Sequence, residues 1–307
     1  MPELPEVETV VRGLRMALPG RRILSVRLGK TDFIEDPVAL EQILPGKRIT
    51  GVRRHGKFLL IDLAPAVAAA DAGSQPAEDT SLLVHLGMTG QLVTSPAESP
   101  APPHTHVFVS LDDGRELRYT DIRRFGQMRI LANGGHASAL GKLGLDPLEA
   151  TEAEFTSLIH ARRAHIKALL LDQHVLRGMG NIYTDESLWR ARIHPRRLGA
   201  NLKPRELRAL YRAVRDVLNE AIRLRGSSVS DYVDADGERG EFQLRHRVYQ
   251  REGEKCFRCK TRIRRIIVAG RSSYFCPHCQ PAPKLKRRPT APRSRAIRRK
   301  SAPRRAR

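Results

Sequence analysis

The stretch Cys256-Phe257-Arg258-Cys259, followed after sixteen residues by Cys276-Pro277-His278-Cys279, contains all four cysteines of this 307-residue chain. Two Cys-x-x-Cys turns at this spacing are typical of a four-cysteine zinc site, and the connection is long enough for a β-hairpin. Zinc would replace the hydrophobic core that so short a segment cannot build. Redox-active thiols or disulfides are the alternatives, but disulfides are normally scattered through an oxidised protein. We therefore expect one structural Zn²⁺ ion, bound by Cys256, Cys259, Cys276 and Cys279.

The N-terminal half of the chain has the pattern of a β-sandwich or barrel preceded by a helix. Residues 3–18 place apolar side chains at the one-face spacing of an amphipathic helix, and Gly20 is a stop signal. Runs with β character follow at 23–28, 49–63, 82–93, 107–111 and 117–119, the last two joined by the predicted turn Asp112-Asp113-Gly114. The stretches 64–80 and 95–103 are expected to be surface loops. We predict a sandwich from this succession of strands and turns.

After about residue 132 the apolar periodicity becomes helical. Helices are predicted over 166–176, 185–191 and 204–224, and Thr151-Glu152-Ala153-Glu154 resembles a capping box. The glycine-containing turn 177–183 suits a helix–turn–helix arrangement. The chain is thus predicted to be an α+β protein with an N-terminal β-sandwich and a helical region before the zinc finger. The predicted parts are a sandwich domain at 2–131, a helical domain at 132–240, the finger at 241–280 and a disordered basic tail at 281–307.

The charge of the chain points to a polyanionic partner. The net charge is +22, and residues 281–307 contribute twelve Lys/Arg and no acid, so the rest of the chain still carries +10. Nucleic acid is the usual partner of such a protein. The tail is expected either to bind phosphates nonspecifically or only to improve solubility. No apolar run approaches the roughly 20 residues of a membrane span, and no secretory signal is recognisable, so a soluble cytoplasmic protein is expected.

The N-terminus offers an unusual nucleophile. Removal of Met1, which a small second residue normally permits, would expose the secondary amine of Pro2 directly before the carboxylate of Glu3. An α-amino group has a pKa of about 8, so part of it is unprotonated near neutral pH and able to form an iminium. Pro2 and Pro5 are equally suited to the first turn of a helix. On these residues alone, both interpretations stay open.

Six motifs in one order give the chain a family resemblance that covers residues 2–280. In chain order they are Pro2–Val10, His55-Gly56-Lys57, His85–Gly90, Asp121–Gly126 with Arg123-Arg124-Phe125, Gly180–Tyr183, and the four-cysteine finger. Together they resemble the formamidopyrimidine-DNA glycosylases, which repair oxidised purines in DNA. The resemblance implies a DNA glycosylase with AP lyase activity, in which residues 132–240 form a helix-two-turn-helix DNA-binding domain. Its partner would be damaged double-stranded DNA bound by a monomer.

The resemblance also implies the catalytic residues. Pro2 would attack C1′ of the damaged nucleotide and expel the base, and Glu3 would donate a proton to O4′ as the sugar ring opens. The iminium acidifies the C2′ proton, so elimination of the 3′ and then the 5′ phosphate would follow. Lys57 and Arg271 match catalytic positions that grip phosphate and assist elimination. Glu6 would orient the nucleophile, although an acid in the first turn also stabilises a helix by itself.

A second set of residues is implied to contact DNA. Since a base inside a duplex must be flipped out, Met88, Arg123 and Phe125 match the residues that fill the gap it leaves. Core packing is the alternative for Met88 and Phe125. The remaining implied contacts to phosphate, or supports of the site, are Asn181, His85, Lys167, Arg124 and His104. For His85 a structural role is an alternative, and for His104 a solvated loop position.

Three functions are consistent with these residues. The leading one is excision of 8-oxoguanine and formamidopyrimidines. An endonuclease VIII-like enzyme would apply the same chemistry to oxidised pyrimidines, but Leu4, Met88 and the Arg123/Phe125 pair favour the purine enzyme. A zinc-finger DNA-binding protein without activity is the third, and intact Pro2, Glu3 and Lys57 argue against it. The segment 227–240 resembles the loop that closes over the damaged purine, and its Ser227-Ser228 replaces threonines that are common in the family.

Overall fold

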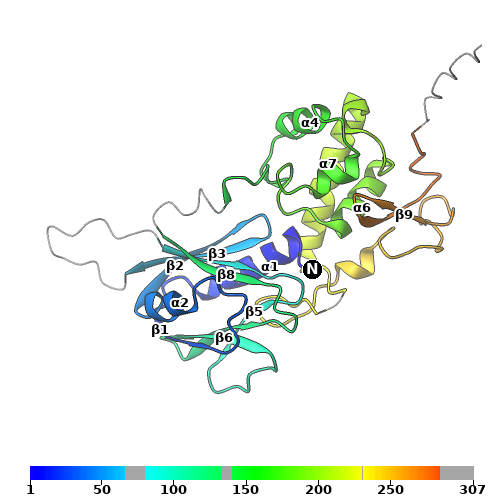
Figure 1. Ribbon diagram of the computed structural model, residues 1–307. Helices are drawn as coiled ribbons and strands as arrows, with labels where there is room; N and C mark the ends of the chain where they lie inside the picture. The colour runs from blue at the N-terminus through cyan, green and yellow to red at the C-terminus, as the bar shows by residue number, and fades with distance from the viewer. Residues whose placement is uncertain (66–79, 133–139, 230, 284–307) are drawn as a thin grey trace, which may run out of the picture.

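The computed structural model describes residues 1–65, 80–132, 140–229 and 231–283 (Figure 1). An N-terminal pair of β-sheets, a helical region and a C-terminal β-hairpin with the four cysteines follow one another along the chain, which confirms the predicted α+β fold. The predicted loop at 64–80 and the predicted tail at 281–307 lie largely outside the described residues. Within those residues, none of the helices combines the length and the apolar character needed to cross a membrane.

Two four-stranded antiparallel sheets form the sandwich. One sheet has the strand order β1–β6–β7–β5 and the other β2–β3–β4–β8, and the two lie one above the other in Figure 1. Side chains from both sheets meet in one apolar core, as expected for strands that bury one face. The strands are β1 (Ile23–Leu28), β2 (Lys47–His55), β3 (Phe58–Pro65), β4 (Thr80–His85), β5 (Gln91–Pro96), β6 (Thr105–Leu111), β7 (Arg115–Thr120) and β8 (Gln127–Ala132).

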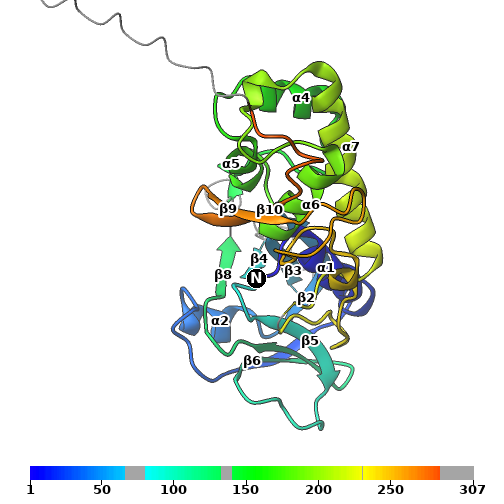
Figure 2. The ribbon, with the colours of Figure 1, turned by 90° about the vertical axis from the view of Figure 1, so that its right-hand side faces the viewer.

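Helix α1 (Leu4–Ala17) joins the sandwich to the helical region. Val7, Val10 and Leu14 are buried in the sandwich core, whereas Leu4 is buried in the core of the helical region. Figure 2 shows α1 between the strands and helices α6 and α7. Because the helix begins in one core and ends in the other, its first residues lie at the junction of the two. A short helix, α2 (Pro37–Ile43), covers part of the sandwich.

Four helices form the second core. They are α4 (Glu152–His160), α5 (Ile166–Leu171), α6 (Asn181–Ala191) and α7 (Pro204–Arg223), and the 3-10 turns η1 (Gly199–Asn201) and η2 (Phe242–Arg245) follow α6 and α7. The predicted capping box at α4 is confirmed, because Thr151 Oγ1 accepts from Glu154 N (3.2 Å) and Glu154 Oε2 accepts from Thr151 N (2.8 Å). The apolar side chains of α7 lie on one face and are buried against the other helices.

The C-terminal region is a hairpin of β9 (Arg264–Val268) and β10 (Arg271–Phe275). Ala269 and Gly270 connect the strands with φ of 49° and 69°, the backbone signature of a two-residue type I′ turn that matches the strand twist. A small apolar cluster that includes Trp189 of α6 packs against the hairpin.

Several predicted element boundaries are wrong. The helix predicted over 166–176 ends at Leu171, since the Asp172 carboxylate accepts from His174 N (2.9 Å) and forms a local turn instead. The helix predicted over 185–191 begins earlier, at Asn181. Each of the β runs 49–63 and 82–93 contains two strands. The first is divided by the turn at Gly56-Lys57, and the second by residues 86–90, which cross from one sheet to the other.

Candidate active site and DNA interface

The N-terminus lies against the first turn of α6. Glu3 is only 3% exposed, and its carboxylate accepts hydrogen bonds from the backbone N–H groups of Ile182 (3.0 Å) and Tyr183 (3.4 Å). A Cβ at Gly180, directly before this turn, would lie 2.1 Å from Glu3 Cδ. The Glu3 carboxylate therefore lies at the positive end of the α6 dipole. It is so close to residue 180 that only glycine fits at that position. Burial raises the pKa of Glu3, whereas the Lys57 ammonium and the two N–H groups lower it.

Lys57 faces the Glu3 carboxylate from the turn between β2 and β3. Gly56 adopts φ 63°, and this turn packs so closely on Arg177 that a Cβ at Gly56 would lie 3.1 Å from Arg177 Cβ. Burial lowers the pKa of the Lys57 ammonium and Arg271 lowers it further, although the nearby Glu3 carboxylate raises it. Because Glu3 and Arg271 both affect the pKa of Lys57, the three residues lie in one site. Pro2, which precedes Glu3 in the chain, is also buried.

A buried ion pair fixes β10, which begins with Arg271, to the helical region. Lys167 Nζ donates to Asp185 Oδ1 (2.7 Å) and to the carbonyl of Ser272 (2.7 Å), and Asp185 Oδ2 accepts from Tyr274 N (2.9 Å). The sequence predicts Lys167 as a DNA contact, but its side chain is fully buried and its ammonium is used inside the protein. The geometry favours a supporting role, in which Lys167 holds the strand that carries Arg271.

His85 and Asn181 border the same site. His85 Nδ1 accepts from Gly87 N (3.1 Å), and burial together with Lys57 lowers the pKa of His85 to about 4. The neutral ring then carries its proton on Nε2, which suits donation to a phosphate oxygen. Asn181 opens α6, and its Oδ1 atom is buried without a hydrogen-bond partner among the described residues. Their roles as DNA contacts stay predictions.

The Asp121 carboxylate organises the surface that carries Met88, Arg123 and Phe125. Asp121 is fully buried and links the turn at residues 86–90 to the segment 121–126. Its Oδ2 atom accepts from Gly126 N (2.9 Å) and from the Tyr119 hydroxyl (3.1 Å), and its Oδ1 atom accepts from Thr89 Oγ1 (2.5 Å) and Arg123 N (3.3 Å). Two loops that follow different strands are thereby held side by side.

The side chains on this surface point outward rather than into the core. Met88 is 38% exposed and Phe125 is 55% exposed, and the Arg123 guanidinium carbon lies 4.5 Å from the centre of the Phe125 ring. The alternative interpretation of Met88 and Phe125 as core residues is therefore wrong. Large apolar side chains exposed on a well-anchored loop are typical of a binding surface.

Arg124 and His104 lie beside the same segment. Arg124 Nη1 donates to both carboxylate oxygens of Asp32 (2.7 and 2.8 Å). The carbonyl of exposed His104 accepts a hydrogen bond from Asp121 N (3.1 Å). The predicted contacts Met88, Arg123, Phe125, Arg124 and His104 thus gather around Asp121. Arg124 would have to leave Asp32, or share it, in order to reach a phosphate.

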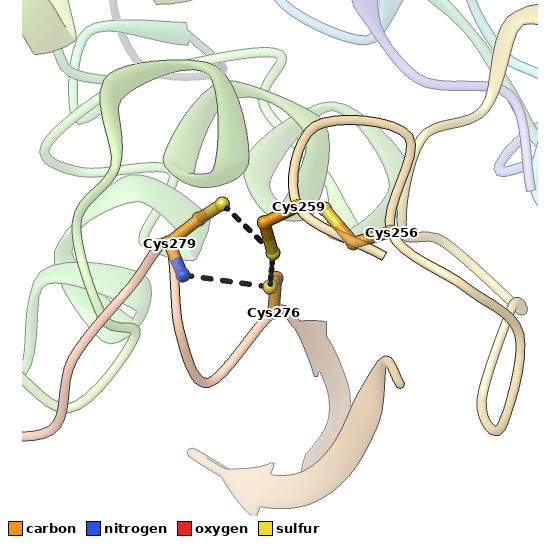
Figure 3. Close-up of side chains that lie close together, drawn as sticks. All are labelled: Cys256, Cys259, Cys276 and Cys279. Carbon is orange, nitrogen blue, oxygen red and sulfur yellow. Dashed lines mark hydrogen bonds between the residues drawn. The ribbon is translucent and has the colours of Figure 1, made fainter. Parts of the chain in front are cut away.

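The four cysteines converge on one point, as Figure 3 shows. Their sulfur atoms all lie within 4.8 Å of one another, with Cys259 Sγ at 3.4 Å from Cys276 Sγ and at 3.5 Å from Cys279 Sγ. Four thiolates around a tetrahedral Zn²⁺ with bonds of about 2.3 Å lie ~3.8 Å apart, so the cluster fits this ion. With four sulfur ligands the site is closed, and its zinc is structural.

Comparison with known protein families assigns each part of the chain. Residues 1–128 match the formamidopyrimidine-DNA glycosylase N-terminal domain, residues 143–233 match the H2TH domain of the same enzymes, and residues 253–282 match the zinc finger found in FPG and IleRS. A formamidopyrimidine-DNA glycosylase of Solibacter usitatus is 44% identical over 282 residues, which cover 91% of this chain and 99% of the relative.

The chain belongs to the formamidopyrimidine-DNA glycosylase family. Solved structures of the family agree with this assignment. A Lactococcus lactis Fpg complex with DNA containing an abasic site superimposes with a TM-score of 0.80 at 33% identity, covering 91% of this chain and 100% of that protein. A mutant of the same protein in complex with DNA containing Fapy-dG gives a TM-score of 0.80 at 33% identity, covering 92% and 100%. The family model and the cysteine geometry together support one structural zinc.

The sequence indicated no structural role for three of the buried acids of this glycosylase-family fold, Asp121, Asp185 and Glu186. Asp121 and Asp185 anchor the two surfaces described above, and Glu186 accepts from the N–H groups of residues 247–249 (2.9–3.0 Å), which fixes the chain before the finger. The sequence contained only a weak signal, namely two adjacent acids, Asp185 and Glu186, in a predicted helix of a strongly basic chain. Their partners lie far away in the sequence, so the contacts themselves were not predictable.

Proposed function

We propose that this protein is a bifunctional DNA glycosylase and AP lyase that removes 8-oxoguanine and formamidopyrimidines from DNA. The observation that carries the proposal is the buried Glu3 carboxylate, held at the N-terminus of α6 next to Pro2 and facing Lys57. A DNA-binding module needs no such cluster, because phosphate contacts work best on exposed side chains. Membership of a family whose relatives are DNA glycosylases supports the same conclusion.

The reaction begins at Pro2 once Met1 has been removed. The Pro2 amine attacks C1′ of the flipped nucleotide, the bond from C1′ to the base breaks, and the base leaves with a proton. Glu3 donates a proton to O4′, so the C1′–O4′ bond opens and the nitrogen–carbon link becomes an iminium. Burial supports this role, since it raises the pKa of Glu3 and favours the protonated acid.

Elimination then removes the sugar from both phosphates. The iminium acidifies C2′, and loss of that proton expels the 3′ phosphate, after which a second elimination expels the 5′ phosphate. Lys57 and Arg271 carry positive charge into this site and are assigned to the phosphate next to the lesion.

The remaining assignments concern how the protein holds DNA. Met88 and Phe125 enter the base stack, and Arg123 donates to the base opposite the lesion, since a guanidinium can form two hydrogen bonds to one base edge.

The zinc ion that shapes the finger is bound by Cys256, Cys259, Cys276 and Cys279. One site and one finger per chain suit a monomer acting in the cytoplasm or nucleoid. The functional units run from 2 to 131, from 132 to 240 and from 241 to 280, and the basic tail follows.

Borohydride trapping tests the proposed function. The purified protein, with Met1 removed, is incubated with a duplex that contains 8-oxoguanine opposite cytosine, and sodium borohydride is added to reduce the iminium. We expect a covalent protein–DNA adduct and a one-nucleotide gap in the unreduced reaction. A parallel duplex with dihydrouracil should react more slowly. Preference for dihydrouracil would instead indicate an endonuclease VIII-like enzyme. If no lesion gives an adduct, the protein is a DNA-binding protein without this activity.

A methyl group at Gly180 is expected to damage the site selectively. Because the added Cβ would lie 2.1 Å from Glu3 Cδ, Gly180→Ala must displace the carboxylate from the α6 terminus. A displacement of about 1 Å reduces catalysis on the order of 10²-fold. Single-turnover excision of 8-oxoguanine measures the loss. Gly51→Ala is the control, since its Cβ would meet Asp62 at an ordinary 3.6 Å, and equal activity of the two variants would contradict the prediction.

A further inference from the structure

Glu6 is a buried carboxylate to which the proposed reaction assigns no step. It is 1% exposed and lies one turn after Glu3 on α1. Its Oε2 atom accepts from the backbone N–H of Glu3 (2.8 Å), and its Oε1 atom accepts from the Tyr183 hydroxyl and from the backbone N–H of Ser227 (2.7 Å). The bond from Glu3 is half of a capping box that stabilises α1. The other two bonds come from distant parts of the chain and need a different explanation.

On the side of the nucleophile, Glu6 holds the peptide that follows Pro2. The N–H group that donates to Oε2 belongs to the peptide linking Pro2 to Glu3. Fixing the plane of this peptide fixes the position of Pro2 Cα, because a peptide unit is rigid, and leaves rotation about the Pro2 Cα–C bond as the one backbone torsion that directs the ring nitrogen. The Glu3 side chain is held separately, by Ile182 and Tyr183.

On the other side, Glu6 holds the segment predicted to contact the damaged base. Gly226, at φ 80°, turns the chain after α7 so that the Ser227 N–H points at Glu6, and a Cβ at Gly226 would lie 2.8 Å from Oε1. Further along, the Tyr232 hydroxyl donates to the Glu6 carbonyl (3.2 Å). Ser228 Oγ closes the arrangement by donating to the carbonyl of Tyr232 (2.7 Å). Ser227 and Tyr232 are therefore both attached to Glu6 of α1.

We propose that Glu6 is a positioning residue that couples Ser227 and Tyr232, which flank the predicted contact with the damaged base, to the placement of the Pro2 nucleophile. The inference rests on the proposed function, since it presumes that Pro2 attacks C1′ of a nucleotide whose base is held near Ser227 and Tyr232. A base that shifts Ser227 or Tyr232 moves Glu6, and Glu6 moves the Pro2–Glu3 peptide. A nucleotide without a base does not engage the segment, so the coupling acts on excision and not on an abasic site.

A carboxylate is required for this task. Three donors point at its two oxygens, and an amide of the same shape has only one oxygen to accept them. Glu6→Gln must therefore give up the bond from the Glu3 N–H or the bond from the Ser227 N–H, because these two donors face different oxygens. Burial raises the pKa of Glu6 to about 7 and Glu3 adds to this effect, whereas the Tyr183 hydroxyl and the two backbone N–H groups lower it.

A double-mutant cycle on trapping rates tests the coupling. Wild type, Tyr232→Phe, Glu6→Gln and the double variant are each trapped with borohydride on an 8-oxoguanine duplex and on an abasic duplex. We expect Tyr232→Phe to slow trapping on 8-oxoguanine by about fivefold, the effect of one lost buried hydrogen bond, and to leave the abasic reaction unchanged. Glu6→Gln should slow both reactions. In the double variant, the effect of Tyr232→Phe should vanish.

Matched controls separate coupling from a loss of stability. Tyr211→Phe removes a tyrosine hydroxyl that donates to a backbone carbonyl, that of Ala150 (3.1 Å), inside the helical region, and should change neither rate. If Glu6→Gln does not fold, Glu6→Asp replaces it, because it keeps the carboxylate but is one methylene too short to reach both the Glu3 and the Ser227 N–H groups. Multiplicative effects of the two substitutions, or equal slowing by Tyr232→Phe on both duplexes, would overturn the inference. A wild type that forms no adduct would refute the proposed function instead.

Discussion

Replacement of Pro2 by glycine is expected to abolish the covalent adduct on an 8-oxoguanine duplex. Removal of a covalent nucleophile lowers turnover by several orders of magnitude. After Met1 removal, Pro2 presents a secondary amine whose ring fixes its direction, and the buried surroundings hold this ring next to Glu3. Glycine would leave a flexible primary amine in its place. Trapping with borohydride, quantified as the fraction of labelled DNA attached to protein, measures the loss.

A chain with a permanent N-terminal extension is the sharper control. It keeps every side chain, but the Pro2 nitrogen becomes an amide and has no free electron pair for attack. We expect no adduct from this chain and full activity after a protease removes the extension. Binding to undamaged DNA should be the same for both forms, because phosphate contacts do not involve Pro2. Adduct formation by the extended chain would assign the nucleophile to another amine, with Lys57 as the first candidate.

The sequence predicted the parts of this fold that local patterns determine. The alternating strands, the hairpin at Asp112-Asp113-Gly114 and the capping box at Thr151 depend on residues near one another, and all three are present. The start of α6 at Asn181 was not predictable in this way. Its first turn is capped by Glu3, from the other end of the chain, so the local sequence around Gly180 contains only part of the signal.

The same distinction applies to the functional residues. The motifs identified Glu3, Lys57 and Arg271, and the structure brings them together. The motifs did not reveal that Lys167 is buried, because the Asp185 and Ser272 atoms that enclose its ammonium are contacts of the folded state. The contacts of Glu6 with Tyr183 and Ser227 are likewise long-range. What sequence reasoning misses here is the layer of buried carboxylates that holds the motif residues in place.

Loss of zinc is expected to unfold the finger and to weaken binding to all DNA. Structural zinc contributes on the order of 10–16 kcal/mol in small zinc domains, which is as large as the whole stability of a typical protein domain. Cys276→Ser removes one of the four ligands, and the hairpin then loses the contacts of Ser272 and Tyr274 with the helical region. Arg271, on the same strand, leaves the active site. Metal analysis should fall from one zinc per chain toward none, and DNA affinity should fall for damaged and undamaged duplexes alike.

The single tryptophan of the chain reports this change directly. Trp189 Nε1–H donates to Cys256 Sγ (3.5 Å), and the Arg258 guanidinium carbon lies 4.0 Å from its ring centre. Unfolding of the finger exposes the ring to water, so its emission should shift to longer wavelength in Cys276→Ser or with a chelator. His278→Ala is the matched control, since exposed His278 lies between two ligands and is not one of them. A Cys276→Ser protein that keeps its zinc, its tryptophan emission and its DNA affinity would refute the structural role of the metal.

The sandwich has its own core and should keep its fold in every variant. A loss confined to DNA binding would therefore show that the finger acts by holding Arg271 and the DNA-facing hairpin in place.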